Sequence, residues 1–167
     1  MKSALMTIFA FTLPAPVAAH EDAAAQALAE TCAEPDQPWL SAQRIDASAS
    51  AARLEHARLA PGEAVYLRLH PDPDVTYITL PRGAGEAASF GGMASFVVET
   101  AGTYRVGVDE AVWVDVVNGV TAAEPVNFGR ASECSGMRKQ VTYNLIPGTY
   151  VLELSGNLDD EIGVVVT

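Results

Sequence analysis

From Pro61 onward, apolar and polar residues alternate in short runs, and this period of two constrains the fold more than any other feature of the chain. In the run 65–69, Val and Leu residues occupy every second position, with Tyr66 and Arg68 between them. Successive side chains of a strand point to opposite faces of a sheet, so the pattern predicts a strand with one buried face. Similar runs predict strands at 75–80, 95–99, 103–108, 111–117, 141–145, 149–154 and 161–166. The chain is therefore expected to be all-β, a β-sandwich or jelly roll of about eight strands.

Two pairs of these runs resemble each other. The tripeptide Gly-Thr-Tyr leads from the turn into the second run of both pairs, at 102–104 and at 148–150. Because a short Gly-containing turn between two alternating runs is typical of a β-hairpin, we expect one hairpin at 95–108 and another at 141–154. In each returning strand, the tyrosine and the apolar residues two and four positions later share one face, which is expected to be the buried one.

The first 19 residues have the pattern of a secretory signal peptide. Lys2 precedes a short apolar stretch, and Val17-Ala18-Ala19 is a small-residue cleavage site after which His20 would come first. The apolar stretch is shorter than the roughly 20 residues that a membrane-spanning helix needs. The sequence therefore predicts a periplasmic or secreted protein without a transmembrane segment.

Residues 20–60 form an alanine-rich segment. Of the 28 alanines in the chain, 18 lie in the first 60 positions, so most large apolar side chains come later. This composition predicts a short helical or irregular segment at 20–60, followed by the β domain at 61–167. Trp39, next to Pro38, is expected to anchor the segment to that domain.

The two cysteines, Cys32 and Cys134, are far apart in the chain. In an oxidising compartment an isolated pair of this kind predicts one disulfide. A metal or redox pair is less well supported, because there is no C-x-x-C and no histidine within a few residues of either cysteine.

The charge of the chain excludes some partners. Ten Lys and Arg residues stand against 21 Asp and Glu, a formal net charge of −11. Nucleic-acid binding requires clustered basic residues, so the balance argues against it, and it also disfavours an anionic membrane surface.

Several segments downstream of Pro61 carry a family resemblance: SFGGMA at 89–94, AGTYRV at 101–106, AVWVDVV at 111–117, Cys134, Arg138-Lys139 and PGTY at 147–150. Together they resemble a family of small exported bacterial all-β proteins that are often labelled homogentisate 1,2-dioxygenase by automatic methods. That label implies an iron held by two histidines and a glutamate. The chain has three histidines and no H-x-H pair, so its own residues do not supply such a set.

Two other metal sites are compatible with the sequence. His20, as a new N-terminal residue, would offer its amine and imidazole to copper, with His56 or His70 completing the site. His70, Asp72 and Asp74 place three potential ligands within five residues, a pattern that also suits calcium. An accidental terminal histidine and a rigid, proline-rich turn are the simpler interpretations.

Trp113 and Asp115 share one face of their predicted strand, and Val112, Val114 and Val116 share the other. If the valines face the core, Trp113, Asp115 and Arg105 form an outward aromatic and polar surface of the kind that stacks on sugar rings. The alternative is that Trp113 packs within the domain.

These observations predict an exported binding or envelope-associated module without enzymatic activity or a required cofactor, whose partner is an unknown envelope component or a glycan. One alternative is a small metalloprotein, either copper-handling or the iron dioxygenase that the family label implies. Another is a calcium-stabilised carbohydrate-binding domain.

Overall fold

A computed structural model describes residues 38–81 and 89–167 of the 167-residue chain. The predicted signal peptide, most of the alanine-rich segment, His20 and Cys32 lie outside the described residues. The disulfide between Cys32 and Cys134 therefore stays a prediction.

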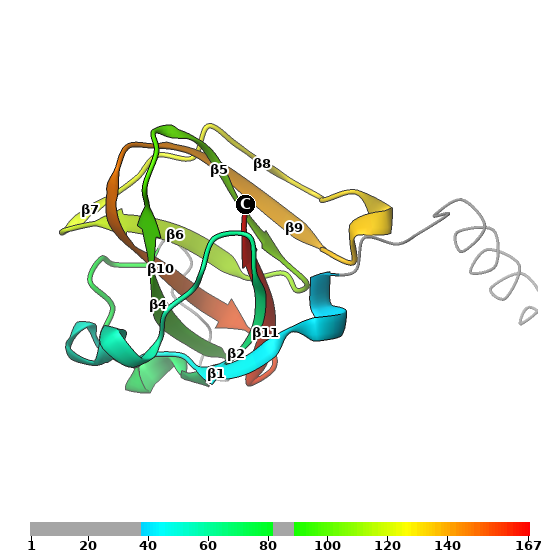
Figure 1. The fold of residues 1–167 in the computed structure, drawn as a ribbon. Coiled ribbons are helices and arrows are strands. Elements are labelled where there is room, and N and C mark those ends of the chain that lie inside the picture. The colour runs from blue at the N-terminus through cyan, green and yellow to red at the C-terminus, as the bar shows by residue number, and fades with distance from the viewer. Residues whose placement is uncertain (1–37, 82–88) are drawn as a thin grey trace, which may run out of the picture. The chain divides into compact units, whose positions relative to one another are not determined.

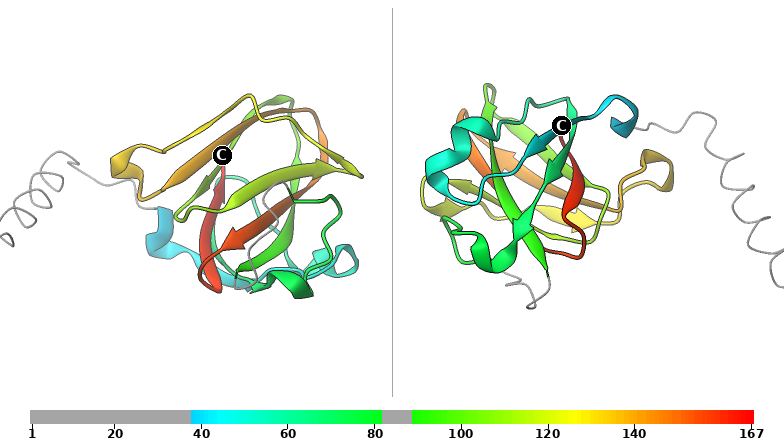
Figure 2. Two further views of the ribbon diagram at one scale, coloured as in Figure 1. Left: turned by 180° about the vertical axis from the view of Figure 1, so that it is seen from behind. Right: turned by 90° about the horizontal axis from the view of Figure 1, so that it is seen from below.

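The described residues form two β-sheets that pack face to face (Figure 1, Figure 2). All strand pairs are antiparallel except β1 with β2. In spatial order the six-stranded sheet contains β1 (Gln43–Asp46), β2 (Ala64–Arg68), β11 (Glu161–Val166), β5 (Gly102–Val108), β9 (Lys139–Leu145) and β8 (Asn127–Gly129). The five-stranded sheet contains β3 (His70–Pro71), β4 (Phe90–Val98), β10 (Gly148–Asn157), β6 (Trp113–Asn118) and β7 (Thr121–Ala122). Four short 3-10 helices are η1 (Pro38–Ser41), η2 (Ala51–His56), η3 (Asp72–Asp74) and η4 (Glu133–Ser135).

The core lies between the two sheets and consists of alternate residues of both. The predicted valine face of β6 is part of it, since Val112, Val114 and Val116 are all buried. Phe96 of β4 and Tyr150 of β10 stack in the same core, with ring centroids 5.7 Å apart. The all-β sandwich predicted from the alternation is confirmed; the additional strands β1, β3, β7 and β8 are short.

The two predicted hairpins are wrong, because in both pairs the chain crosses from one sheet to the other. Strands β4 and β5 belong to different sheets, and so do β9 and β10. Each strand of one crossing pairs with a strand of the other: Val98 lies opposite Gly148, and Gly102 lies opposite Leu145. A period of two specifies which face of a strand is buried, but it does not specify which sheet the strand joins.

The repeated Gly-Thr-Tyr has a structural role at these crossings. The Tyr104 hydroxyl donates to the carbonyl of Thr100 at 2.9 Å, and the Tyr150 hydroxyl donates to the carbonyl of Ile146 at 3.0 Å. Each tyrosine thus ties the first residues of its strand back to the preceding turn, as tyrosine corners do in other sandwiches. The two similar segments therefore share the same structural role.

The predicted strand at 75–80 is also wrong, because this segment lies across the outer face of the five-stranded sheet. Val75, Tyr77 and Ile78 pack there, with Leu54, on the buried residues Met93, Val117 and Val151. The segment has one isolated bridge, between Thr76 and Ser50, and no strand ladder, and part of it is held by the side chain of Glu153 on β10. That carboxylate accepts hydrogen bonds from the backbone N–H of Ile78, at 2.6 Å, and from the N–H and hydroxyl of Thr79.

Strand β4 begins with Phe90, Gly91 and Gly92. At Gly91 a Cβ atom would clash with the Tyr77 hydroxyl, the Asp72 carboxylate and the carbonyl of Leu154. The glycine therefore permits a close approach of side chains over the strand, and it is not a sign of irregular backbone.

Part of the expected alanine-rich segment belongs to the sandwich. Strand β1 pairs with β2 at the edge of the six-stranded sheet, and Ala47, Ala57 and Leu59 are buried in the core cluster. Trp39 anchors the start of this region as expected: its indole N–H donates to the carbonyl of Gly136 at 2.9 Å.

Candidate functional site

The predicted surface of Trp113, Asp115 and Arg105 is only partly assembled. Trp113 and Asp115 lie on the outer face of β6, opposite the buried valines. Arg105 lies on β5 and is exposed on the other sheet, since its neighbours Tyr104 and Val106 face the core. The arginine therefore belongs to a different surface from the tryptophan.

Trp113 is half exposed, at 49%, and its ring is held by Lys139. The Lys139 Nζ lies 5.4 Å from the centre of the indole ring and donates to the carbonyl of Val112 at 2.6 Å. Burial lowers the pKa of Lys139, and the charge of Asp115 opposes this effect. A cation over an indole face is attracted by the negative charge of the π system, so the ring has a defined position on the surface.

Asp115 is not part of that open surface, because it is only 6% exposed. It lies directly opposite Glu153, which is 2% exposed, on the neighbouring strand β10. Glu153 accepts three hydrogen bonds from the segment 75–80, which covers the outer face of the five-stranded sheet, and its carboxylate holds that covering segment in place. Both carboxylates are therefore buried on the outer face of the five-stranded sheet and are not open to a ligand.

The predicted calcium ligands His70, Asp72 and Asp74 have separate surroundings. Asp72 accepts hydrogen bonds from the Tyr77 hydroxyl at 2.5 Å, the Ser89 hydroxyl at 2.8 Å and the Gly156 N–H at 2.9 Å. The His70 Nε2 lies 2.9 Å from the carbonyl of Ala47, while Asp74 is exposed. Asp72 thus ties three segments of the chain together, and its oxygens are occupied by protein donors.

Within 38–81 and 89–167, no three His, Cys, Asp or Glu side chains form a group that could hold a metal ion. His56, a predicted copper ligand, is exposed, and its Nε2 lies 3.4 Å from the Oε1 of Glu55. The described histidines do not fit the two-histidine, one-carboxylate iron site that the family label implies. His20 lies outside the described residues, so the proposed N-terminal copper site stays a prediction.

The structure also forms a hollow that the sequence analysis missed. Its volume is about 530 Å³, and it lies where the chain leaves β1 and β2. We call it the basic hollow, and its charged or titratable lining residues are Asp46, Arg53, His56, Arg68 and His70. The signal that could have found it is the distribution of charge. Residues 41–70 contain four of the ten Lys and Arg residues and two of the three histidines, but only three of the 21 acids.

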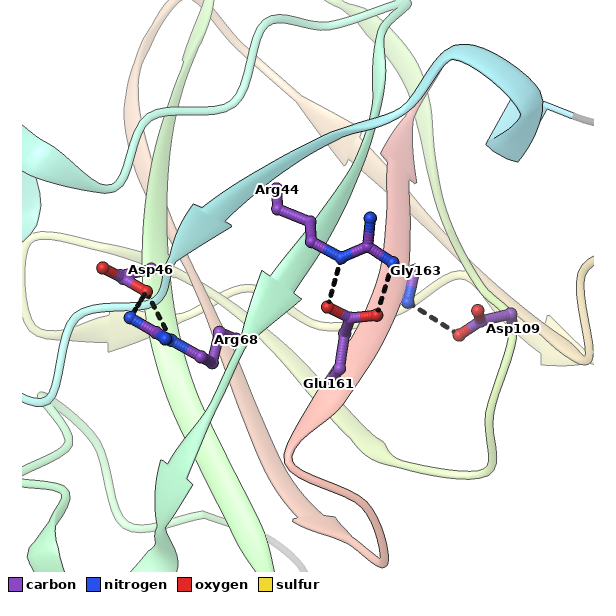
Figure 3. A network of polar contacts seen from close by, with 6 residues as sticks. All are labelled: Arg44, Asp46, Arg68, Asp109, Glu161 and Gly163. Carbon is purple, nitrogen blue, oxygen red and sulfur yellow. Dashed lines mark hydrogen bonds and ion pairs between the residues drawn. The ribbon is translucent and has the colours of Figure 1, made fainter.

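Exposed ion pairs lie beside the basic hollow (Figure 3). Arg44 of β1 reaches across β2 to Glu161 of β11, with nitrogen–oxygen distances of 2.8 and 3.2 Å. Arg68 contacts Asp46, its register partner on β1, through Nε at 2.7 Å and Nη2 at 2.6 Å. These pairs are open to solvent and contribute little to stability, so their arginines are accessible to a ligand.

Asp109 lies on the same side of the six-stranded sheet, close to β11 (Figure 3). Its carboxylate accepts the Gly163 N–H at 2.8 Å. Burial raises the pKa of Asp109, and the hydrogen bond from Gly163 partly opposes this rise. A side chain at position 163 would meet both this carboxylate and the Trp39 ring, so the glycine makes the contact possible.

No protein-family model matches the chain, and no curated protein is significantly similar to it. Among solved structures, the chain is similar to the pre-peptidase C-terminal domain of a collagenase from Bacillus anthracis. The match has 13% sequence identity, covers 66% of this chain and 93% of that one, and has a TM-score of 0.35. A similarity of this size supports no conclusion about function. No helix among the described residues is long and apolar enough to cross a lipid bilayer.

Proposed function

We propose that the protein is an exported, envelope-associated module that binds a glycan by stacking a sugar ring on Trp113. The observation that carries the proposal is the half-exposed indole, fixed on a rigid strand by the ammonium group of Lys139. Export rests on the N-terminal pattern of Lys2, the apolar stretch and the Val17-Ala18-Ala19 site.

The position of Trp113 supports stacking better than that of the other exposed aromatic side chain among the described residues. Phe128 is 71% exposed but lies on the three-residue edge strand β8. Trp113 lies on the six-residue strand β6, where it is the register partner of Ser155 on β10. A ring whose orientation is already fixed loses less conformational entropy when a sugar stacks on it.

Polar groups near the indole are mostly occupied. Lys139 is bound to the carbonyl of Val112, and Asp115 is buried. Binding on this surface would therefore depend mainly on the apolar face of a sugar ring and less on directed hydrogen bonds. The proposal accordingly favours recognition of a neutral sugar chain with modest affinity per ring.

The test is affinity electrophoresis of the mature protein through gels containing soluble neutral polysaccharides. We expect at least one polysaccharide to retard the wild type, and Trp113→Ala to remove the retardation. The matched control is Phe128→Ala, which deletes the other exposed aromatic ring and should migrate like the wild type. Equal retardation of Trp113→Ala and wild type, or no retardation of the wild type by any polysaccharide, would contradict the proposal. Melting temperatures of both variants verify that they are folded.

The metalloprotein alternative has a separate test, because a dioxygenase or copper protein must carry metal in stoichiometric amount. Elemental analysis of mature protein, purified without chelator or histidine tag, decides this point. About one iron or copper per chain would replace the binding proposal by the metalloprotein alternative. Calcium stabilisation would instead raise the melting temperature on addition of Ca²⁺.

A further inference from the structure

The basic hollow has a shape that suits a compact ligand. Its floor is apolar, because Ala47, Ala57 and Leu69 are all buried beneath it. Its walls come from the segment after β1, from η2 and from the end of β2. The volume of about 530 Å³ lies within the range of small-molecule sites and exceeds what a bare inorganic ion would fill.

The charge at its rim has the opposite sign to that of the whole protein. The lining residues include two arginines, Arg53 and Arg68, against one carboxylate, that of Asp46, and they also include His56 and His70. The rest of the chain, outside 41–70, contains six basic residues and 18 acidic ones, from the totals of 10 and 21. A positive rim in so acidic a protein favours an anionic group at this place and disfavours one on most of the remaining surface.

Two arginines at the rim have hydrogen-bond donors to spare. The Arg53 side chain makes no hydrogen bond or ion pair with any other described residue. Arg68 directs its Nε and Nη2 toward a single oxygen of Asp46, and within the described part of the chain its Nη1 has no polar partner. A guanidinium group binds a carboxylate or a similar oxyanion through two parallel N–H bonds, which both side chains can still offer.

His70 adds an acceptor for a hydroxyl group. Its Nε2 lies 2.9 Å from the carbonyl of Ala47, and a carbonyl only accepts, so this nitrogen carries the hydrogen. In the neutral ring, Nδ1 is then an acceptor. The hollow therefore combines oxyanion donors, a hydroxyl acceptor and an apolar floor.

A second hollow continues from the first. Its volume is about 510 Å³, and it shares Asp46, His56 and Arg68 with the basic hollow while adding Arg44 and Glu161. Figure 3 shows the two ion pairs of this region on neighbouring strands. The continuity leaves room for a further unit attached to the first, as in an oligosaccharide.

We propose that the basic hollow binds an acidic sugar, a uronate unit whose carboxylate contacts Arg53 and Arg68 and whose ring lies over Ala57 and Leu69. This site is independent of the stacking surface at Trp113, which lies on the outer face of a different sheet from Arg68. The ligand it takes is distinguished from a neutral sugar by its carboxylate and from inorganic anions by its ring.

The experiment is an NMR titration of the mature protein with glucuronate and, in parallel, with glucose, which differs by having a hydroxymethyl group in place of the carboxylate. We expect glucuronate to bind at least tenfold more tightly than glucose and to shift the amide signals of 46–49, 53–57 and 68–70. Arg53→Gln and Arg68→Gln should each weaken glucuronate binding about tenfold, which corresponds to about 1.4 kcal/mol. Arg105→Gln removes an exposed arginine elsewhere on the six-stranded sheet and should bind like the wild type.

Three results would overturn the inference: equal binding of glucuronate and glucose, equal binding of glucuronate and inorganic phosphate, or no binding of glucuronate at millimolar concentration. Loss of binding in Arg105→Gln to the same extent as in Arg53→Gln would show a general charge effect and would also overturn it. Trp113→Ala is expected to keep glucuronate binding. The experiments therefore distinguish a failure of glycan stacking at Trp113 from a failure of glucuronate binding in the basic hollow.

Discussion

The outer faces of the two sheets differ in the solvent exposure of their charged residues. On the five-stranded sheet, a second layer formed by residues near η2 and by 75–80 covers the strands, and Glu153 and Asp115 are buried beneath or beside it. On the six-stranded sheet, Arg44, Arg68, Asp46 and Glu161 form ion pairs in solvent. The carboxylate of Glu153 holds the segment 75–80 and is not available to a ligand, whereas the exposed charges of the six-stranded sheet are.

The largest expected effect comes from removing the buried carboxylate. Glu153→Ala leaves the N–H groups of Ile78 and Thr79 without their acceptor and should lower the free energy of unfolding by about 3 kcal/mol. The measurement is urea denaturation followed by circular dichroism. Glu161→Ala, the matched change on the exposed face, should have a much smaller effect. Similar losses in the two variants would remove the distinction between the faces.

Gly91→Ala tests how tightly the segment 75–80 packs on the outer face of the five-stranded sheet. A Cβ atom there would meet the Tyr77 hydroxyl and the backbone oxygen of Leu154, so the covering segment must move. We expect a loss of about 2 kcal/mol in the free energy of unfolding. At Gly129, on the edge strand β8, nothing lies within 4 Å of the position that a Cβ atom would take, so Gly129→Ala should be nearly neutral. A neutral Gly91→Ala would mean that the second layer is loosely packed.

A pH dependence is expected from Asp109 on the six-stranded side. Burial raises the pKa of this carboxyl in the folded protein, so the folded state binds more protons than the unfolded state between the usual carboxyl pKa and the raised one. Its contribution to stability therefore falls as the pH rises through that window. Asp109→Asn lacks this loss, and its stability relative to wild type should increase across the window and stay constant above it. A constant difference at all pH values would contradict the assignment.

The smallest effect is expected at the exposed ion pair of Arg44 and Glu161. Solvent screens this pair, so Arg44→Gln should change the denaturation midpoint only slightly at low salt and not detectably at high salt. The measurement is thermal denaturation at two salt concentrations. A fall in the denaturation midpoint that is the same at both salt concentrations would contradict this expectation and would mean that Arg44 stabilises the fold.

The sequence was sufficient for the long strands of the sandwich and for the buried valines of β6, because alternation reports directly on burial, but it did not predict the short strands β1, β3, β7 and β8. It was not sufficient for the partners of each strand, since the runs before and after Thr100 would alternate equally well in a hairpin or in a crossing between sheets. The segment 75–80 looked like a strand because it is short and rich in β-branched and aromatic residues, a composition that equally suits a segment packed on the outside of a sheet. At the candidate sites, Trp113 was found from its position in the strand. The basic hollow was not, because Arg53 of η2 and Arg68 of β2 line it together only in the folded chain, and no local pattern specifies this.

The reciprocal pairing of the two crossings has a consequence for when the protein can fold. Neither crossing contains a strand pair of its own, because β4 needs β10 and β5 needs β9. The register joins residue 98 to residue 148, fifty positions later, so these central contacts form only after most of the chain is available. Sequences dominated by such distant contacts fold slowly. If the chain is exported as its N-terminal pattern predicts, we expect β4 and β6 to stay without their shared partner until β10 has crossed the membrane, so that the five-stranded sheet closes only then.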